Sequence, residues 1–200
     1  MCGILLFYGP QAKKRLENNI FKLKHRGPDE TATYHNGFLS LGFNRLAIND
    51  KTSLGRQPFK YNNYISVING EIYNHLELRE QFNISIEEKC DTHVVLPLFE
   101  RLHDNVISVL DGFYSGLIFN TKSHEFFSLR DYIGKKPLFI GKSFSEVFIT
   151  SELKAIKTID SFEMLPKGIS KIALNKKKVI PLRNHCFDQN PEKKFHSKNI

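Results

Sequence analysis

Cysteine and metal-ligand patterns are scarce in this sequence. Its 200 residues hold three cysteines, at positions 2, 90 and 186. An odd, widely separated set forms neither a disulfide framework nor a C-x-x-C metal or redox motif. The eight histidines show no shared metal-ligand spacing, so we expect no metal site. Reduced thiols and a cytoplasmic location are therefore expected.

Membrane and leader segments are also missing. No apolar run approaches the roughly 18 residues that a membrane helix needs. The apolar stretch at 4–8 follows no basic residue and is too short for a signal peptide. With 40% hydrophobic residues, including 17 Phe and 7 Tyr, the chain has enough apolar material for one domain with a substantial core.

The charge is positive but dispersed. Lys and Arg number 29 against 21 Asp and Glu, which gives a net charge of +8. The basic residues are scattered at 13–15, 22–26, 135–136, 176–178 and 193–194. No zinc-finger, helix-turn-helix or RNA-recognition pattern accompanies them. We expect neither a nucleic acid nor a membrane as partner.

Short strand-like segments dominate the chain. The continuous apolar run at 4–8 is typical of a strand buried on both faces. Further strands are predicted at 38–43, 64–68, 112–119, 125–129, 137–141 and 146–150, and helices at 11–24, 76–82 and 92–102. Many strands and few helices indicate an α+β fold with antiparallel sheets. The domain is expected to span 1–185, with 186–200 a basic tail or the start of a linker.

Cys2 directly follows the initiator methionine and precedes the first buried strand. If Met1 is removed, Cys2 carries both a thiol and a free α-amine. Their reference pKa values lie near 8.5 and 7.7–8.0, so the amine is able to take the thiol proton near neutrality. The alternative is a small buried core thiol.

Asn69 and Gly70 stand between an apolar strand and a predicted helix. A side-chain NH₂ and an unshielded backbone N–H are the two convergent donors that a tetrahedral oxyanion requires. The alternative is an ordinary Asn-Gly turn with Glu71 in the first turn of a helix.

Four further residues, at three places in the chain, have two interpretations each. Arg45 follows a strand and is either a carboxylate-binding group or a surface charge. Asp91 precedes the third helix, where N-capping is the commoner role. Arg26 and Gly27 belong to a segment, 25–29, that also fits a plain turn after the first helix.

Taken together, these segments match a known family. The chain resembles the class II glutamine amidotransferases, whose nucleophile is N-terminal, and most closely the glutaminase domain of asparagine synthetases. The match rests on Met-Cys-Gly-Ile at 1–4, His-Arg-Gly-Pro-Asp at 25–29, Asn-Gly-Glu-Ile-Tyr-Asn-His at 69–75, Cys-Asp-Thr-His at 90–93, and related stretches at 44–48, 57–59, 111–114, 130–138 and 151–155. The resemblance implies a four-layer αββα sandwich with two antiparallel sheets.

The resemblance also implies roles in the hydrolysis of L-glutamine to glutamate and ammonia. Cys2 attacks the side-chain amide after Met1 is removed, with its own α-amine as proton shuttle. Asn69 and Gly70 form the oxyanion hole.

The remaining implied roles concern substrate binding and support. Arg45 holds the substrate α-carboxylate, and Glu71 and Asp91 take its α-ammonium. Arg26 and Gly27 support the loop of the nucleophile.

One expected part of the family is missing. No Ser-Gly-Gly-x-Asp-Ser loop or other glycine-rich phosphate loop occurs, so ATP and Mg²⁺ are expected only on an absent synthetase domain or partner chain that receives the ammonia. The acceptor is aspartate by family default, with a sugar or another carboxylate as alternatives. A catalytically silent binding or regulatory module on the same fold is the competing hypothesis.

Overall fold

The computed structural model describes residues 1–85 and 90–183. Two six-stranded sheets form its centre, and every strand pairing in them is antiparallel. The first sheet has the order β10-β8-β9-β1-β3-β2, from Ser161–Met164, Phe139–Ser143, Glu146–Thr150, Gly3–Tyr8, Leu39–Arg45 and Glu30–Asn36. The second has the order β12-β11-β7-β6-β5-β4, from Lys178–Arg183, Gly168–Ala173, Phe126–Arg130, Gly112–Asn120, Tyr64–Ile72 and Phe59–Tyr61.

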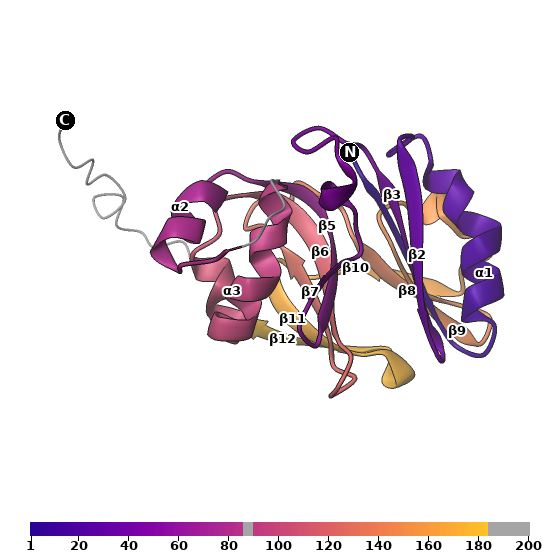
Figure 1. Cartoon of the computed structure of the whole chain (residues 1–200). Helices are drawn as coiled ribbons and strands as arrows, with labels where there is room; N and C mark the ends of the chain where they lie inside the picture. Colours follow the sequence, from indigo (N-terminus) through magenta and orange to yellow (C-terminus); the bar gives the residue numbers. More distant parts are fainter. Residues whose placement is uncertain (86–89, 184–200) are drawn as a thin grey trace.

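Helices cover the outer face of each sheet (Figure 1). Helix α1, Ala12–Asn19, lies on the first sheet, and helices α2, His75–Gln81, and α3, Val95–Leu102, lie on the second. Short 3-10 helices occur at Ile20–Leu23, Ser53–Gly55, Asp91–Val94, His103–Ser108, Leu153–Ala155 and Leu174–Lys176. The predicted αββα sandwich is confirmed. Within the described ranges, no helix has the length and apolar character needed to cross a membrane.

Strand β1 shows why the sandwich forms. Because successive side chains on a strand point to opposite faces, Ile4 and Leu6 enter the core between the sheets. Leu5 and Phe7 pack beneath α1 on the other face. All four side chains are fully buried, so the prediction of a strand covered on both faces is confirmed.

The structure corrects several predicted boundaries. The helices predicted at 11–24 and 92–102 are α-helical only over Ala12–Asn19 and Val95–Leu102, with 3-10 turns at Ile20–Leu23 and Asp91–Val94. The strand predicted at 64–68 was expected to end at Ile68, with an Asn-Gly turn after it as one alternative. Strand β5 instead runs to Ile72, and Asn69 pairs with Ser115 of β6 inside the ladder. The turn interpretation is therefore wrong, because Asn69 and Gly70 have extended neighbours on both sides.

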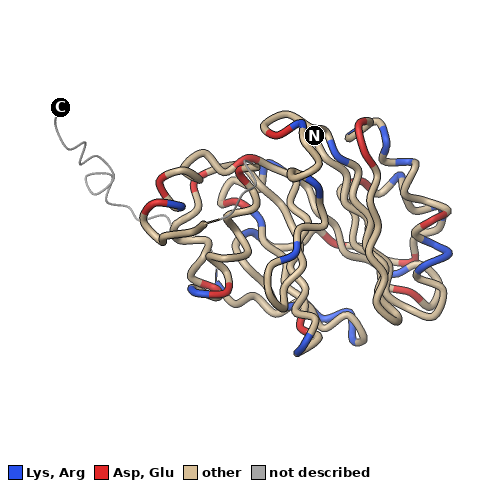
Figure 2. Tube along the Cα trace, in the orientation of Figure 1, with Lys and Arg blue, Asp and Glu red and all other residues tan. Residues whose placement is uncertain are grey.

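Charged positions are interleaved along the fold. Figure 2 shows Lys and Arg on the outer helices and on the hairpins, with Asp and Glu among them. Residues 186–200, including Cys186 and the expected tail, lie outside the described residues.

Candidate active site

The start of β1 and the ends of β3 and β5 meet at a small open pocket with a cavity volume of about 90 Å³. The register of β1 on β3 places Gly3 opposite Asn44, so Cys2 comes next to the loop that follows β3. The predicted site residues that line this pocket are Cys2, Arg45, Asn69, Gly70, Glu71 and Asp91. Positions as far apart as 2 and 91 in the sequence therefore share one cavity.

Cys2 is anchored by its backbone while its thiol lines the pocket. Its backbone nitrogen donates to Asn69 Oδ1 at 2.8 Å, and Leu46 N lies 3.4 Å from Cys2 Sγ as a donor. Burial raises the pKa of the Cys2 thiol. The Leu46 N–H, the terminal ammonium of Met1 and the charges of Arg45 and Arg26 lower this pKa. Met1 precedes it, is largely exposed and also lines the pocket.

Asn69 faces Cys2 from the second sheet. Its side chain is buried, and its Oδ1 accepts from Cys2, which leaves the amide NH₂ for another partner. Among the described residues, Nδ2 of Asn69 has no hydrogen-bond partner. A buried donor without a partner costs about 1–3 kcal/mol, so Nδ2 is the atom of this side chain with hydrogen-bonding capacity to spare.

Gly70 is required by packing. A Cβ on this residue would lie 2.6 Å from the Cα of Tyr114 on the neighbouring strand and would overlap the Phe113 carbonyl. Glycine therefore lets β5 and β6 stay paired here while the Gly70 backbone still lines the pocket.

Arg45 ends β3, and the loop after it holds its guanidinium. Nη1 donates to the Thr52 carbonyl at 3.0 Å and pairs with Glu30 at 3.4 Å, and Nη2 donates to the Asp50 carbonyl. A Cβ at Gly55 would overlap Nη2. With a side chain only 9% exposed, Arg45 is a fixed cation in the pocket wall, not a mobile surface charge.

Asp91 does not cap the helix that follows it. The N-cap position is Cys90, without a side-chain cap bond. Asp91 Oδ2 instead accepts from the Ile72 backbone at 2.6 Å, and Oδ1 accepts from Asn49 Nδ2 at 2.9 Å. The carboxylate thus ties the end of β5 to the loop after β3. Glu71, by contrast, is exposed at the rim.

Arg26 and Gly27 lie behind the pocket, not in its lining. Arg26 Nε donates to the Cys2 carbonyl at 2.8 Å, and Nη1 donates to Glu152 Oε1 at 2.6 Å. A Cβ on Gly27 would overlap the carbonyl of Asn44, so this turn packs directly on β3.

Several pocket residues escaped the sequence analysis. Gln57 donates to the Ile68 carbonyl at 3.1 Å and accepts from the Ile68 N–H at 2.6 Å, which fixes β5 one residue before Asn69. Leu46 and Asn49 act through contacts that only the tertiary structure creates. Gln57 belongs to a stretch that carried the family resemblance, and this was the signal available in the sequence.

The pocket combines the thiols of Cys2 and Cys90 with charges of both signs. Three carboxylate residues, Asp50, Glu71 and Asp91, line the pocket. The fixed cation of Arg45 together with the carboxylates of Glu71 and Asp91 suits a zwitterionic amino acid. The unpartnered amide of Asn69 and the Gly70 backbone lie beside Cys2, where acyl transfer needs donors for a developing oxyanion. Lys136 adds a second cation to the lining.

Comparison with known proteins agrees with this geometry. A family profile described as "Glutamine amidotransferase domain" matches residues 1–190. The chain is 39% identical over 178 residues to the nodule asparagine synthetase (glutamine-hydrolyzing) of Pisum sativum, which covers 84% of this chain and 30% of that protein. The asparagine synthetase (glutamine-hydrolyzing) 2 of Lotus japonicus gives the same identity and coverage. The chain thus spans under a third of the length of these relatives.

A solved structure shares the fold. Glutamine phosphoribosylpyrophosphate amidotransferase from B. subtilis, complexed with ADP and GMP, superposes with a TM-score of 0.72 at 23% identity, covering 86% of this chain and 47% of that chain. At this identity the likeness concerns the fold, and it agrees with the two-sheet sandwich. Because the profile spans nearly the whole chain and the relatives exceed 30% identity over most of it, this chain belongs to the glutamine amidotransferase domain family.

Proposed function

We propose that this chain hydrolyses L-glutamine to glutamate and ammonia, with Cys2 as the nucleophile once Met1 has been removed. One observation carries the proposal. The Cys2 nitrogen lies 2.8 Å from Asn69 Oδ1, while the Cys2 thiol and the unpartnered Asn69 amide belong to the same pocket. An N-terminal cysteine here would hold nucleophile, base and oxyanion donor within one hydrogen-bonded unit.

The chemistry follows from these groups. The α-amine of Cys2 takes the thiol proton, and the sulfur adds to the side-chain amide carbon of glutamine. Asn69 Nδ2 and the Gly70 N–H donate to the resulting oxyanion. The ammonium of Cys2 then returns its proton to the leaving nitrogen, ammonia departs, and a γ-glutamyl thioester remains. Water attacks this thioester, glutamate is released, and the thiol is restored.

Charge complementarity assigns the substrate contacts. Arg45 binds the α-carboxylate of glutamine, because the loop contacts already hold its guanidinium in place. Glu71 and Asp91 bind the α-ammonium. Arg26 and Gly27 support the nucleophile from behind through the Cys2 carbonyl and the packing on Asn44.

The ammonia is then used elsewhere. We propose that a synthetase domain or partner chain, which binds ATP and Mg²⁺, receives it and forms an amide, with asparagine as the product. The family membership and the names of the two plant relatives support this assignment. A sugar or a different carboxylate is the alternative acceptor.

Glutamate release tests the proposal. Intact mass first shows that the purified protein begins at Cys2. This protein is then incubated with glutamine, and glutamate is quantified over time. Wild-type protein is expected to release glutamate, and Cys2→Ala is expected to release none above the uncatalysed rate. Cys186→Ala is the matched thiol control and should retain activity; it is chosen because the third thiol, Cys90, lines the same pocket as Cys2. Equal rates for wild type and Cys2→Ala would exclude Cys2 as nucleophile.

A further inference from the structure

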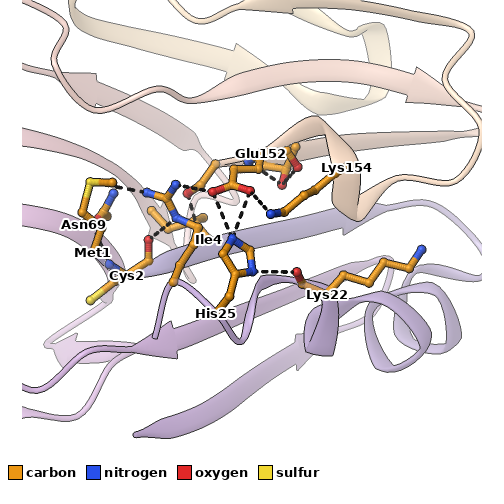
Figure 3. A network of polar contacts seen from close by, with 11 residues as sticks. Met1, Cys2, Ile4, Lys22, His25, Asn69, Glu152 and Lys154 are labelled. Carbon is orange, nitrogen blue, oxygen red and sulfur yellow. Dashed lines mark hydrogen bonds and ion pairs between the residues drawn. The ribbon is translucent and has the colours of Figure 1, made fainter. Parts of the chain in front are cut away.

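The carboxylate of Glu152 contacts three basic side chains behind the pocket (Figure 3). Arg26 Nη1 donates to Oε1 at 2.6 Å, and Lys154 Nζ lies 3.0 Å from Oε2. His25 Nε2 lies 3.2 Å from both oxygens. Although burial opposes ionisation, hydrogen bonds from these partners lower the pKa of Glu152 to about 2. The group is therefore an anion throughout the physiological range.

The backbone around Glu152 is fixed to the strand that carries the nucleophile. Ser151 N donates to the Ile4 carbonyl at 2.9 Å, and Ser151 Oγ accepts from Ile4 N at 3.0 Å. Thr150 Oγ1 donates to the Glu152 carbonyl at 3.0 Å. Because Ile4 is two residues from Cys2, the position of this carboxylate is coupled to the start of β1.

Arg26 connects the carboxylate to Cys2. Its side chain is 5% exposed, against 26% for Glu152, so the guanidinium lies in the more buried position of the pair. A buried cation needs a paired anion, and a bond to an ionised partner is about twice as strong as a neutral one. Through Nε the same guanidinium donates to the Cys2 carbonyl at 2.8 Å.

We propose that Glu152 is a positioning residue for the Cys2 nucleophile: it orients Arg26 against the Cys2 carbonyl and offsets the Arg26 charge beside the Cys2 amino group. Glu152 is not among the residues that line the pocket, so it acts through Arg26 and not on the substrate. The inference rests on the proposed function. It assigns a role to the Ser-Glu-Leu-Lys-Ala segment at 151–155, in which no residue has a role in the proposed function.

The charge effect has a defined sign. The charged or titratable side chains that face Cys2 across the pocket or from behind it are Arg26, Arg45, Asp50, Glu71, Cys90, Asp91 and Lys136. Those that face Glu152 are His25, Arg26 and Lys154. Removing the Glu152 charge leaves the positive charges of Arg26 and Lys154 uncompensated, which disfavours the protonated form of the nearby Cys2 amine. The amine then becomes available as a base at lower pH.

Glu152→Gln tests both parts of the proposal, with glutamate release measured from pH 5 to 9. We expect kcat to fall about tenfold or more while KM changes less than about twofold, since an ionic contact to Arg26 is lost and the pocket lining is intact. We also expect the acidic limb of the pH–rate profile to move down by about half a pH unit or more. A purely structural loss would lower the rate at every pH without moving the limb.

Glu146→Gln is the matched control. Glu146 is a buried carboxylate on β9 that pairs with Arg15 at 3.2 Å and accepts from Gln11 N at 3.0 Å, away from the pocket. Its substitution should lower thermal stability and leave the acidic limb where it is in the wild type.

The outcomes separate the two proposals. Wild-type chain without glutaminase activity contradicts the proposed function itself. An active wild type, with a Glu152→Gln profile that superposes on it, overturns the role of Glu152 alone. If Glu152→Gln does not fold, Glu152→Asp replaces it, because it keeps the charge and shortens the reach. A lower kcat, with KM within about twofold of wild type and an unchanged melting temperature, then supports the proposal, because a purely structural loss would also lower the melting temperature. Wild-type kcat refutes it.

Discussion

Replacing Asn69 by aspartate separates the two tasks that this side chain performs. Asn69 Oδ1 accepts from the Cys2 nitrogen at 2.8 Å, and the buried Nδ2 is the proposed oxyanion donor. Asn69→Asp keeps an acceptor of the same size facing Cys2 and replaces the donor with an anionic oxygen. Asn69→Ala removes both.

The magnitude follows from the missing donor. Loss of one oxyanion donor costs about 10²–10³ in kcat, which corresponds to about 2.7–4 kcal/mol of transition-state stabilisation. Asn69→Asp and Asn69→Ala should both show this loss of kcat. The KM for glutamine should change little, because Arg45 and Asp91 are untouched. In Asn69→Asp the new carboxylate also favours the protonated Cys2 amine, so the acidic limb should move to higher pH.

The assay is steady-state glutamate release as a function of pH, with Asn120→Asp as control. Asn120 lies at the far end of the same β5–β6 ladder, opposite Tyr64, and uses its Oδ1 as an acceptor for the N–H groups of Lys122 and Ser123. The control carries the same change of charge and should retain wild-type kcat. If Asn69→Asp keeps more than about a third of wild-type kcat, the side chain is not an oxyanion donor.

Two further predictions concern substrate binding and stability. Arg45→Met should raise KM for glutamine about 10–100-fold with a smaller effect on kcat, because a charge-assisted contact to the substrate carboxylate is lost; a KM within about twofold of wild type in initial-rate assays would assign the carboxylate to another residue. His93 is fully buried and stacked on Phe59 at 3.9 Å, and burial lowers its pKa to about 4. Its folded pKa lies below the unfolded value of 6.5, so the unfolded chain binds the additional proton, and stability falls by about 3 kcal/mol between pH 6.5 and 4. His93→Phe should remove most of this pH dependence in urea denaturation, and an unchanged dependence would contradict the assignment.

The parts of the fold that follow from the sequence are those with an apolar pattern. The run at 4–8 and the hairpin around 120–123 appear as β1 and the β6–β7 connection. Strands β2, β4, β10, β11 and β12 were missed. Strand β10 is an edge strand of only four residues, all exposed, which is too short for its alternation to stand out. Strand β12 is an edge strand that contains Pro181, a residue that argues against a strand in the sequence.

The site shows the same division between local and long-range information. Cys2 and Asn69 stand in short motifs whose chemistry the sequence itself suggests. The fold brings the Cys2 nitrogen to 2.8 Å from Asn69 Oδ1. The ends of strands and helices were harder to predict from the sequence. Strand β5, for example, continues through Asn69 because it pairs there with β6, which is distant in the sequence. Glu152 belongs to a stretch that carried the family resemblance, but the sequence does not show its link to Cys2, which runs through Arg26, 126 positions away.

The most direct test is the site of covalent modification by a glutamine-analogue electrophile. The account predicts one adduct per chain, on residue 2 of protein that begins at Cys2, identified by mass spectrometry of the N-terminal peptide and prevented by excess glutamine. An adduct on Cys90, or equal labelling of chains that still carry Met1, would contradict it.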